Sequence, residues 1–269
     1  MKLRNILYLS ALSLAAFVNF SCSELDENER LIEAPLQPEE IVRNVLVEDF
    51  TGQNCVNCPT AHEIVEQLQE QYGREHLVAV SIHGGSLAIH EDDRAYGLAN
   101  DLGEEYNRFW EVKEWPKGMV DRSPLLSHLS WTAKIVDDYV KYTPLDIEIA
   151  TTFNENNREL TVDVTTNSTE ALAGKLQIWL TEDEIVAPQY MPNGRRDNSY
   201  VHNNVLRAAV NGTWGTDYEV SRNGSTHDTF TYEIREDWDA DNIAVVAFVY
   251  DNDGVVQVIR KPLKENVAQ

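Results

Sequence analysis

The stretch FTGQNCVNCPTAHEIV, residues 50–65, places Cys55 and Cys58 three positions apart, after a strand-like run and before a helix-like run. The preceding segment, NVLVEDF (44–50), is rich in β-branched residues, which is typical of a buried strand. Apolar residues then recur at helical spacing until a glycine ends them, and HLVAVSI (76–82) follows as a second strand-like run. This order predicts two parallel strands joined by a right-handed helical crossover, with Cys55 where the first strand gives way to the helix.

The cysteine pair allows three interpretations: a redox pair, a metal clamp or a structural disulfide. A zinc site needs four ligands, and His62, at helical spacing after Cys58, is the only further candidate nearby. We expect His62 to be a solvated helix residue and no metal to be bound. Covalent haem is excluded because Pro59 stands where the CxxCH motif requires histidine. The redox and structural interpretations stay open.

The first 21 residues have the features of a secretory signal. Lys2 and Arg4 form a short basic leader, and the apolar run ILYLSALSLAAFVNF (6–20) is shorter than the about 20 residues that a membrane span needs. The small residue before Cys22 resembles the cleavage site of bacterial lipoproteins, which implies acylation of the Cys22 sulfur. Simple secretion is the alternative. The acidic SELDENER that follows predicts a tether, and it resembles the surface-export signal of Bacteroidota lipoproteins, which implies surface exposure.

Composition and patterning bound the remainder of the chain. The formal net charge of −23 argues against nucleic acid as a partner, because binding nucleic acid requires clustered Lys and Arg. The 269 residues suffice for two domains beyond the signal, and the pattern changes near residue 143 from alternating helices and strands to strands only. Alternating apolar and polar runs, such as LDIEIATTF (145–153) and NIAVVAFVYD (242–251), predict an antiparallel β-sandwich of immunoglobulin-like type.

Two segments fit neither pattern. Residues 187–215 have no clean periodicity and form the only basic and aromatic stretch, with Arg195, Arg196, His202, Arg207 and Trp214. They are either a contact surface or an ordered loop packed across both domains, and we favour the loop. His83 and His90 flank a glycine-containing segment and are expected to be polar loop residues.

The segment VLVEDFTGQNCVNCP (45–59) resembles the active-site strand, loop and helix start of the thioredoxin superfamily. In that superfamily an acidic residue precedes the first cysteine by six positions, as Asp49 precedes Cys55, and a cis-proline facing the disulfide precedes a short strand. The segment EVKEWPKGMVDR (111–122) supplies that proline as Pro116. The expected hairpin after it is cut short by SPLLSHL, although WTAKIVDDYVKY supplies a closing helix.

The resemblance implies a role for each residue of the site. Cys55 would attack, because a helix N-terminus lowers the pKa of a thiol, and Cys58 would resolve the mixed disulfide. Asp49, if buried beneath the pair, would take the proton of the resolving thiol; the alternative is an exposed strand-end carboxylate. Pro116 would hold the Trp115 backbone extended against the cysteines to bind an incoming peptide. The alternative for Pro116 is an ordinary trans turn proline.

The signal-like start, VEDFTGQNCVNCP, EWPKGMVDR and YVHNNVLRAAVNGTWG together resemble the lipoproteins of Bacteroidota related to outer membrane protein 28. That family implies an outer-membrane location in the cell envelope. The expected fold is an α/β thioredoxin-like domain followed by an all-β immunoglobulin-like sandwich domain. The segments expected along the chain are a signal peptide (1–21), a lipidated N-terminus and acidic tether (22–40), the thioredoxin-like domain (41–142) and the sandwich (143–269).

The leading hypothesis is therefore an envelope thiol-disulfide oxidoreductase that needs no cofactor. Its partners would be protein thiols or disulfides of the envelope, and the lipid on Cys22 would hold it to the membrane. The alternative hypothesis is an outer-membrane surface binding or adhesion lipoprotein whose CxxC is structural or vestigial.

Overall fold

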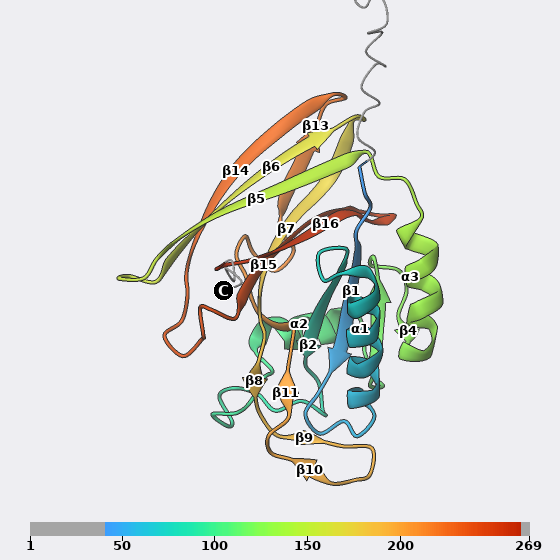
Figure 1. Cartoon of the computed structure of the whole chain (residues 1–269), viewed down its shortest axis with the longest axis vertical. Helices are drawn as coiled ribbons and strands as arrows, with labels where there is room; N and C mark the ends of the chain where they lie inside the picture. Colours follow the sequence, from blue (N-terminus) through green and yellow to red (C-terminus); the bar gives the residue numbers. More distant parts are fainter. Residues whose placement is uncertain (1–40, 265–269) are drawn as a thin grey trace, which may run out of the picture. The chain divides into compact units, whose positions relative to one another are not determined.

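In the computed structural model, which describes residues 41–264, a nine-stranded sheet runs through most of the protein (Figure 1). Its strands are β1 (Val45–Thr51), β2 (Leu77–His83), β3 (Lys117–Val120), β4 (Leu126–Ser127), β7 (Leu172–Glu182), β12 (Val205–Ala209), β13 (Thr216–Val220), β15 (Ile243–Asp251) and β16 (Gly254–Pro262). They lie in the order β16-β15-β7-β12-β2-β1-β3-β4, with β13 also paired to β7.

The remaining elements cover this sheet or extend from it. A three-stranded sheet has the order β14-β6-β5, from β14 (Gly224–Glu233), β6 (Glu159–Ser168) and β5 (Leu145–Asn154). Short pairs join β8 (Ile185–Val186) to β11 (Val201–His202) and β9 (Gln189–Tyr190) to β10 (Arg196–Asp197). The helices are α1 (Cys58–Tyr72), α2 (Asp101–Phe109), the 3-10 helix η2 (His128–Ser130) and α3 (Trp131–Tyr139).

The strand-helix-strand unit predicted around the cysteines is confirmed. β1 and β2 are parallel, with Val45 opposite Leu77, and α1 connects them. α1 ends before Gly73, whose φ of 87° is readily adopted only by glycine. The helix begins with Cys58 and Pro59, and proline suits this position because the first helical N–H groups need no intrahelical partner.

One face of β1 lies beneath α1 and α3 (Figure 1). Val45 and Val47 pack there against Ala61 and Val65 of α1 in one buried cluster. Side chains alternate between the faces of a strand, so the side chain of Asp49 points to the same face. A carboxylate is thus placed under α1, in line with two core valines.

The smaller sheet packs against the C-terminal part of the large one. Ile147 of β5 and Val162 of β6 share a buried cluster with Ile178 of β7 and Val245 of β15. The two sheets face each other across this core. The chain is therefore mostly β structure, as its second half predicts.

The sequence predicts a domain boundary after residue 142, and the large sheet contains strands from both sides of this position. β2 joins β12 through Ser81, whose N–H donates to the main-chain oxygen of Asn204 (2.7 Å). A buried cluster also unites Val80 of the first half with Trp179 and Phe248 of the second. Residues on both sides of this position thus share one sheet and one core, within a single compact unit that starts at Ile41.

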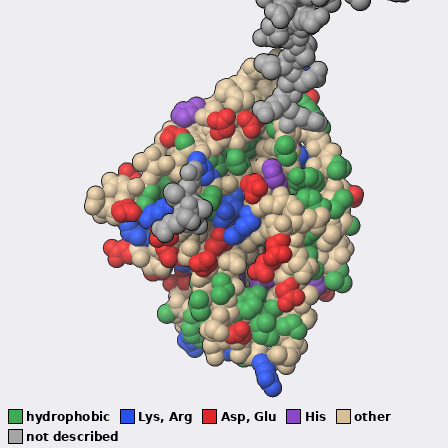
Figure 2. All heavy atoms as spheres, viewed as in Figure 1, with side chains coloured by type: hydrophobic (Ala, Val, Ile, Leu, Met, Phe, Trp, Pro, Cys, Tyr) green, Lys and Arg blue, Asp and Glu red, His purple; other side chains and the backbone are tan. Residues whose placement is uncertain are grey.

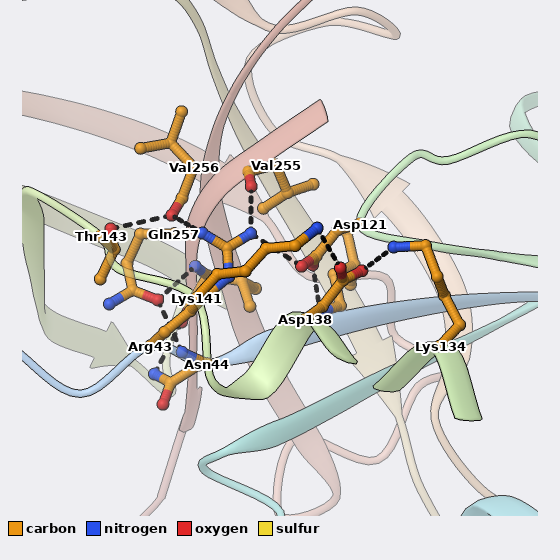
Figure 3. A network of polar contacts seen from close by, with 12 residues as sticks. Arg43, Asn44, Asp121, Lys134, Asp138, Lys141, Thr143, Val255, Val256 and Gln257 are labelled. Carbon is orange, nitrogen blue, oxygen red and sulfur yellow. Dashed lines mark hydrogen bonds and ion pairs between the residues drawn. The ribbon is translucent and has the colours of Figure 1, made fainter. Parts of the chain in front are cut away.

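Polar contacts connect the residues just before β1 to β16 (Figure 3). The Arg43 guanidinium donates to Oδ2 of Asp121 (2.9 Å) and to the main-chain oxygens of Val255 and Val256. The Asn44 N–H donates to Oε1 of Gln257 (2.9 Å). The Arg43 bonds satisfy two main-chain oxygens of β16, which is an edge strand of the large sheet.

Acidic side chains are spread over the face drawn in Figure 2, with Lys and Arg among them near its centre. Within residues 41–264, no helix has the length and apolar character needed to cross a membrane. The predicted signal (1–21), the predicted lipidation site Cys22 and the predicted tether (22–40) lie outside the described residues.

Candidate functional site

Cys55 and Cys58 form a disulfide at the start of α1. Their Cα atoms lie 5.4 Å apart, and Cys55 sits in the loop that follows β1. The two residues between them, Val56 and Asn57, are exposed, whereas Cys55 and Cys58 are 2% and 0% exposed. The pair is where the sequence predicts it, but its sulfur atoms are covered.

β9 packs against the cysteine loop. Nε2 of Gln189, a fully buried residue, donates to the main-chain oxygen of Cys55 (2.9 Å) and lies 3.3 Å from that of Gly52. The Tyr190 N–H donates to the main-chain oxygen of Gln53 (2.8 Å). The stretch 187–215 therefore contains an ordered loop packed against the first half, which is the interpretation that we favour from the sequence.

Asp49 is buried beneath α1, at 2% exposure, so the exposed alternative is wrong. Neither carboxylate oxygen has a hydrogen-bond partner in the described part of the chain. Burial in this setting disfavours the charged form and raises the pKa of Asp49 to about 8. The carboxyl group is consequently protonated for the most part at neutral pH.

His62 is the side chain that meets Asp49, and the expectation of a solvated helix residue is wrong. Its side chain is 12% exposed, and Nε2 lies 3.5 Å from Oδ2 of Asp49 and 3.0 Å from Oγ1 of Thr51. Nδ1 lies 2.9 Å from the hydroxyl of Tyr200. Burial lowers the pKa of His62 to about 3, so the ring is neutral. His62 also follows Cys58 by four positions, which puts both on one face of α1.

Two further histidines enlarge this polar cluster. His83 is not an exposed loop residue as expected: it ends β2 and is 2% exposed, as is His202 of β11. The His83 and His202 ring centroids lie 5.5 Å apart, and the His202 centroid lies 6.4 Å from that of His62. Burial lowers the pKa of His83 well below its ordinary value and that of His202 to about 4.

The cluster borders a small pocket lined by Asp49, His62, Ser81, Tyr200 and Asn203, among others. It offers about 20 Å³ to a water-sized sphere, which is enough for a water molecule. Among the residues that the structure describes, no three His, Cys, Asp or Glu side chains are placed to hold a metal ion together. The arrangement is thus suited to holding and moving a proton next to the disulfide-bearing helix.

The peptide bond between Trp115 and Pro116 is cis, so the trans alternative is wrong. Lys117, the next residue, pairs with Phe50, which places Pro116 beside the end of β1, where the loop to the cysteines begins. The Trp115 indole packs on Gly85: a Cβ on that glycine would lie 2.4 Å from Cζ2 of Trp115. The roles of Pro116 and Trp115 in binding a peptide stay predictions.

The sequence contained a signal for only part of this cluster. The four-residue spacing of Cys58 and His62 places both on one helix face, and alternation along β2 places His83 on the face of Ala79 and Ser81. Tyr200 and His202 come from a stretch without periodicity, and nothing local indicates that it lies over the cysteine loop.

The fold and the site define a β-rich protein with a buried Cys-x-x-Cys disulfide at a strand-helix junction. The chain belongs to the family of outer membrane protein Omp28, whose model matches residues 103–267, more than half of the sequence. Membership confirms the predicted family and the predicted outer-membrane location. The matched range does not include Cys55 and Cys58.

Among solved structures, HBP35 of Porphyromonas gingivalis is similar with a TM-score of 0.66 and 15% identity, over 86% of this chain and 79% of that chain. The likeness shows a shared fold. A domain of the outer membrane lipoprotein Omp28 from the same organism is 24% identical, over 46% of this chain and 92% of its own, with a TM-score of 0.33. No curated protein matches the chain.

Proposed function

We propose that the protein is an envelope lipoprotein, anchored through Cys22, that exchanges disulfides with other proteins at Cys55 and Cys58. Its first half would act as a thioredoxin-like module joined to an immunoglobulin-like sandwich. The observation that carries the proposal is the disulfide at the start of α1, next to a strand that holds Asp49 buried and without a hydrogen-bond partner among the described residues. The parallel β1-α1-β2 unit supports it.

Exchange begins when a thiolate of a client protein attacks Sγ of Cys55. A bond forms between the client sulfur and Cys55, the Cys55–Cys58 bond breaks, and Cys58 leaves as a thiolate that takes up one proton. In the reverse direction Cys58 loses that proton and attacks Sγ of Cys55, which releases the client thiolate. The positive end of the α1 dipole favours the thiolate form of either cysteine.

Asp49 would supply and accept this proton. Its pKa of about 8 keeps the carboxyl protonated at neutral pH, so that it can donate to the departing Cys58 thiolate and later accept the proton back. Asp49 is enclosed, so its proton must be exchanged with solvent through a neighbour. His62 touches it, and the other ring nitrogen of His62 contacts the half-buried hydroxyl of Tyr200 at the small pocket. The neutral imidazole can accept a proton on one nitrogen while it releases one from the other.

Both cysteines are buried, so a client protein can reach Cys55 only after a local movement, and we assign this movement to β9, which is bonded to the Cys55 main chain. Hydrogen bonds from Gln189 and Tyr190 hold β9 to the cysteine loop, and a bond from Gln53 to the main-chain oxygen of Pro188 adds to them. Each is worth about 1 kcal/mol net, so local opening costs far less than global unfolding.

The test is turnover in an insulin-reduction assay with dithiothreitol as the reductant, run on the chain from residue 23 onward so that no other cysteine is present. We expect catalysis by this protein, none by Cys55→Ser, and trapped mixed disulfides between Cys58→Ser and envelope proteins. No turnover together with no trapped partner would refute the proposal.

Burial of both cysteines favours a second candidate, a surface binding lipoprotein stabilised by a structural disulfide. Thermal unfolding after reduction separates the two. A structural disulfide predicts a loss of stability of about 2 kcal/mol, the value for so short a closed loop, with no exchange activity. A redox pair predicts a folded reduced form that is reoxidised by a disulfide substrate.

A further inference from the structure

An aromatic pocket lies on the other side of the sheet from α1 and takes no part in the proposed exchange. We define it by Phe109 and Trp110 at the end of α2, Trp214 in the loop after β12, and Tyr250 near the end of β15. The positions of α2 and β15 can be followed in Figure 1. The pocket has a volume of about 520 Å³, within the range of about 300–1,000 Å³ typical of small-molecule sites.

The walls of the aromatic pocket present flat apolar surfaces. The Phe109 ring centroid lies 4.3 Å from that of Trp214 and 4.9 Å from that of Trp110. Phe109 is 59% exposed, so its ring presents apolar surface to the pocket. Tyr250 is held in place because its hydroxyl donates to the main-chain oxygen of Trp214 (2.8 Å).

A buried cation lines this pocket. The side chain of Arg122 is 4% exposed, and its guanidinium carbon lies 3.8 Å from the ring centroid of Tyr250. Two successive residues, Asp121 and Arg122, have positive φ values of 49° and 58°, a costly backbone conformation that turns the chain sharply after β3. This turn places the Arg122 side chain at the pocket.

The charge of Arg122 is incompletely compensated. Its Nε and Nη2 atoms are enclosed and have no hydrogen-bond partner within residues 41–264. The carboxylate of Glu48 approaches Nε to 3.6 Å, which is an ion-pair distance but too long for a hydrogen bond. Burial raises the pKa of Glu48 to about 7, so this carboxyl group is partly protonated near neutral pH. It therefore neutralises the charge of Arg122 only in part. A buried cation that is compensated only by aromatic rings and a distant carboxyl attracts an anion placed in the adjoining pocket.

We infer that the aromatic pocket binds a flat apolar ligand that carries a single carboxylate. The rings of the ligand would lie against Phe109 and Trp214, and the carboxylate would face Arg122, whose planar guanidinium suits that group. Lys175 also lines the pocket but is paired with Asp217 (2.7 Å), so Arg122 is the cation that selects the charge. Asp251 lines the pocket as well and disfavours a second negative charge on the ligand.

The test uses 2-naphthoate and its neutral isostere 2-naphthamide as probes, with quenching of tryptophan fluorescence as the readout. We expect 2-naphthoate to bind about ten-fold or more tightly than the amide, because a bond to a charged group distinguishes them. Arg122→Met should abolish this preference while keeping the apolar contacts. Phe109→Ala should weaken both probes by about three- to ten-fold, the worth of one aromatic contact. Tyr142→Ala removes an equally exposed aromatic ring elsewhere and should change neither.

Glu48→Gln should strengthen binding of the anionic probe instead of weakening it. The substitution removes the carboxylate that competes with the probe for Arg122 and keeps the shape of the side chain. We expect 2-naphthoate to bind several-fold more tightly to Glu48→Gln at pH 8 and the amide to be unaffected. Equal affinity of the two probes for the unmodified protein would overturn the inference, as would affinities that are unchanged in both Phe109→Ala and Glu48→Gln. These last two variants decide the matter if Arg122→Met does not fold.

Discussion

Nε2 of His62 lies 3.5 Å from Oδ2 of Asp49, and this is the one ion-pair contact of that carboxylate with a described residue. Both groups are buried and both are neutral at pH 7, because burial raises the pKa of Asp49 to about 8 and lowers that of His62 to about 3. The contact is therefore a neutral pair that can exchange a proton rather than a salt bridge that fixes the helix.

The first prediction concerns stability and pH. The Asp49 carboxyl binds its proton up to about pH 8 in the folded protein but only to about pH 3.8 in the unfolded chain, so folding takes up a proton between these values. The protonated Asp49 carboxyl therefore contributes to stability at low pH, and this contribution is lost as the pH rises from about 3.8 to about 8. Asp49→Asn should leave stability unchanged near pH 4 and raise it by about 1–3 kcal/mol at pH 8, measured by urea unfolding. An Asp49→Asn effect that does not vary with pH would contradict the shifted pKa. Glu48 titrates in both proteins and so cancels in the comparison.

The second prediction concerns the proton path. His62→Gln and Tyr200→Phe should each slow the resolution of a mixed disulfide at Cys55 several-fold near pH 7, because Asp49 then exchanges its proton with solvent more slowly. Alkylation of Cys55 in the reduced protein should keep its rate. His90→Gln, which alters a histidine outside the cluster, is the control. The rate at which the mixed disulfide is resolved is measured by stopped flow from pH 6 to 9. Loss of a proton relay changes how this rate depends on pH, whereas a packing defect lowers the rate by the same factor at every pH.

The third prediction concerns access to the disulfide. Gln189→Ala removes the donor that holds β9 to the main-chain oxygens of Cys55 and Gly52. We expect reduction by dithiothreitol to become about five- to ten-fold faster, since one or two hydrogen bonds no longer oppose opening. Asn198→Ala alters an exposed side chain of the same stretch and should have no effect. An unchanged rate in Gln189→Ala would show that β9 is not the barrier.

The fourth prediction concerns the shared sheet. A chain that ends after Tyr142 lacks β12, which borders β2, and lacks Trp179 and Phe248 of the core that contains Val80. We expect this shortened chain to lose cooperative urea unfolding and to bind the dye ANS, because it exposes the apolar face of β1 and β2. Cooperative unfolding with a normal dependence on urea would mean that the first half folds independently.

Local patterns predicted the elements well. The β-branched run before Cys55, the stripe on α1 and the alternation in β5, β6 and β15 each reflect a side-chain period that the backbone imposes. Asp49 and Pro116 were found by resemblance, and the structure places the first beneath α1 and gives the second a cis bond. Both are positions at which a local motif already determines the geometry.

The joining of the two halves could not be predicted in this way. β2 and β12 share a single pair in register, Ser81 with Val205, and Asn204 precedes it with a φ of 58°. Hydrophobic periodicity shows which face of a strand is buried but not which edge it meets. The histidine cluster depends on long-range packing in the same way, because His202 reaches His62 and His83 only once β11 lies against α1 and the end of β2.

The bonds from Arg43 and Asn44 to β16 span more than 210 positions of the chain. Synthesis proceeds from the N-terminus, so β1 is made early. Arg43 and Asn44, just before it, cannot form these bonds until β16 has been made. Contacts at such separation delay folding. β1, which is made first, therefore completes its contacts only after β16, the last strand of the large sheet, has been made.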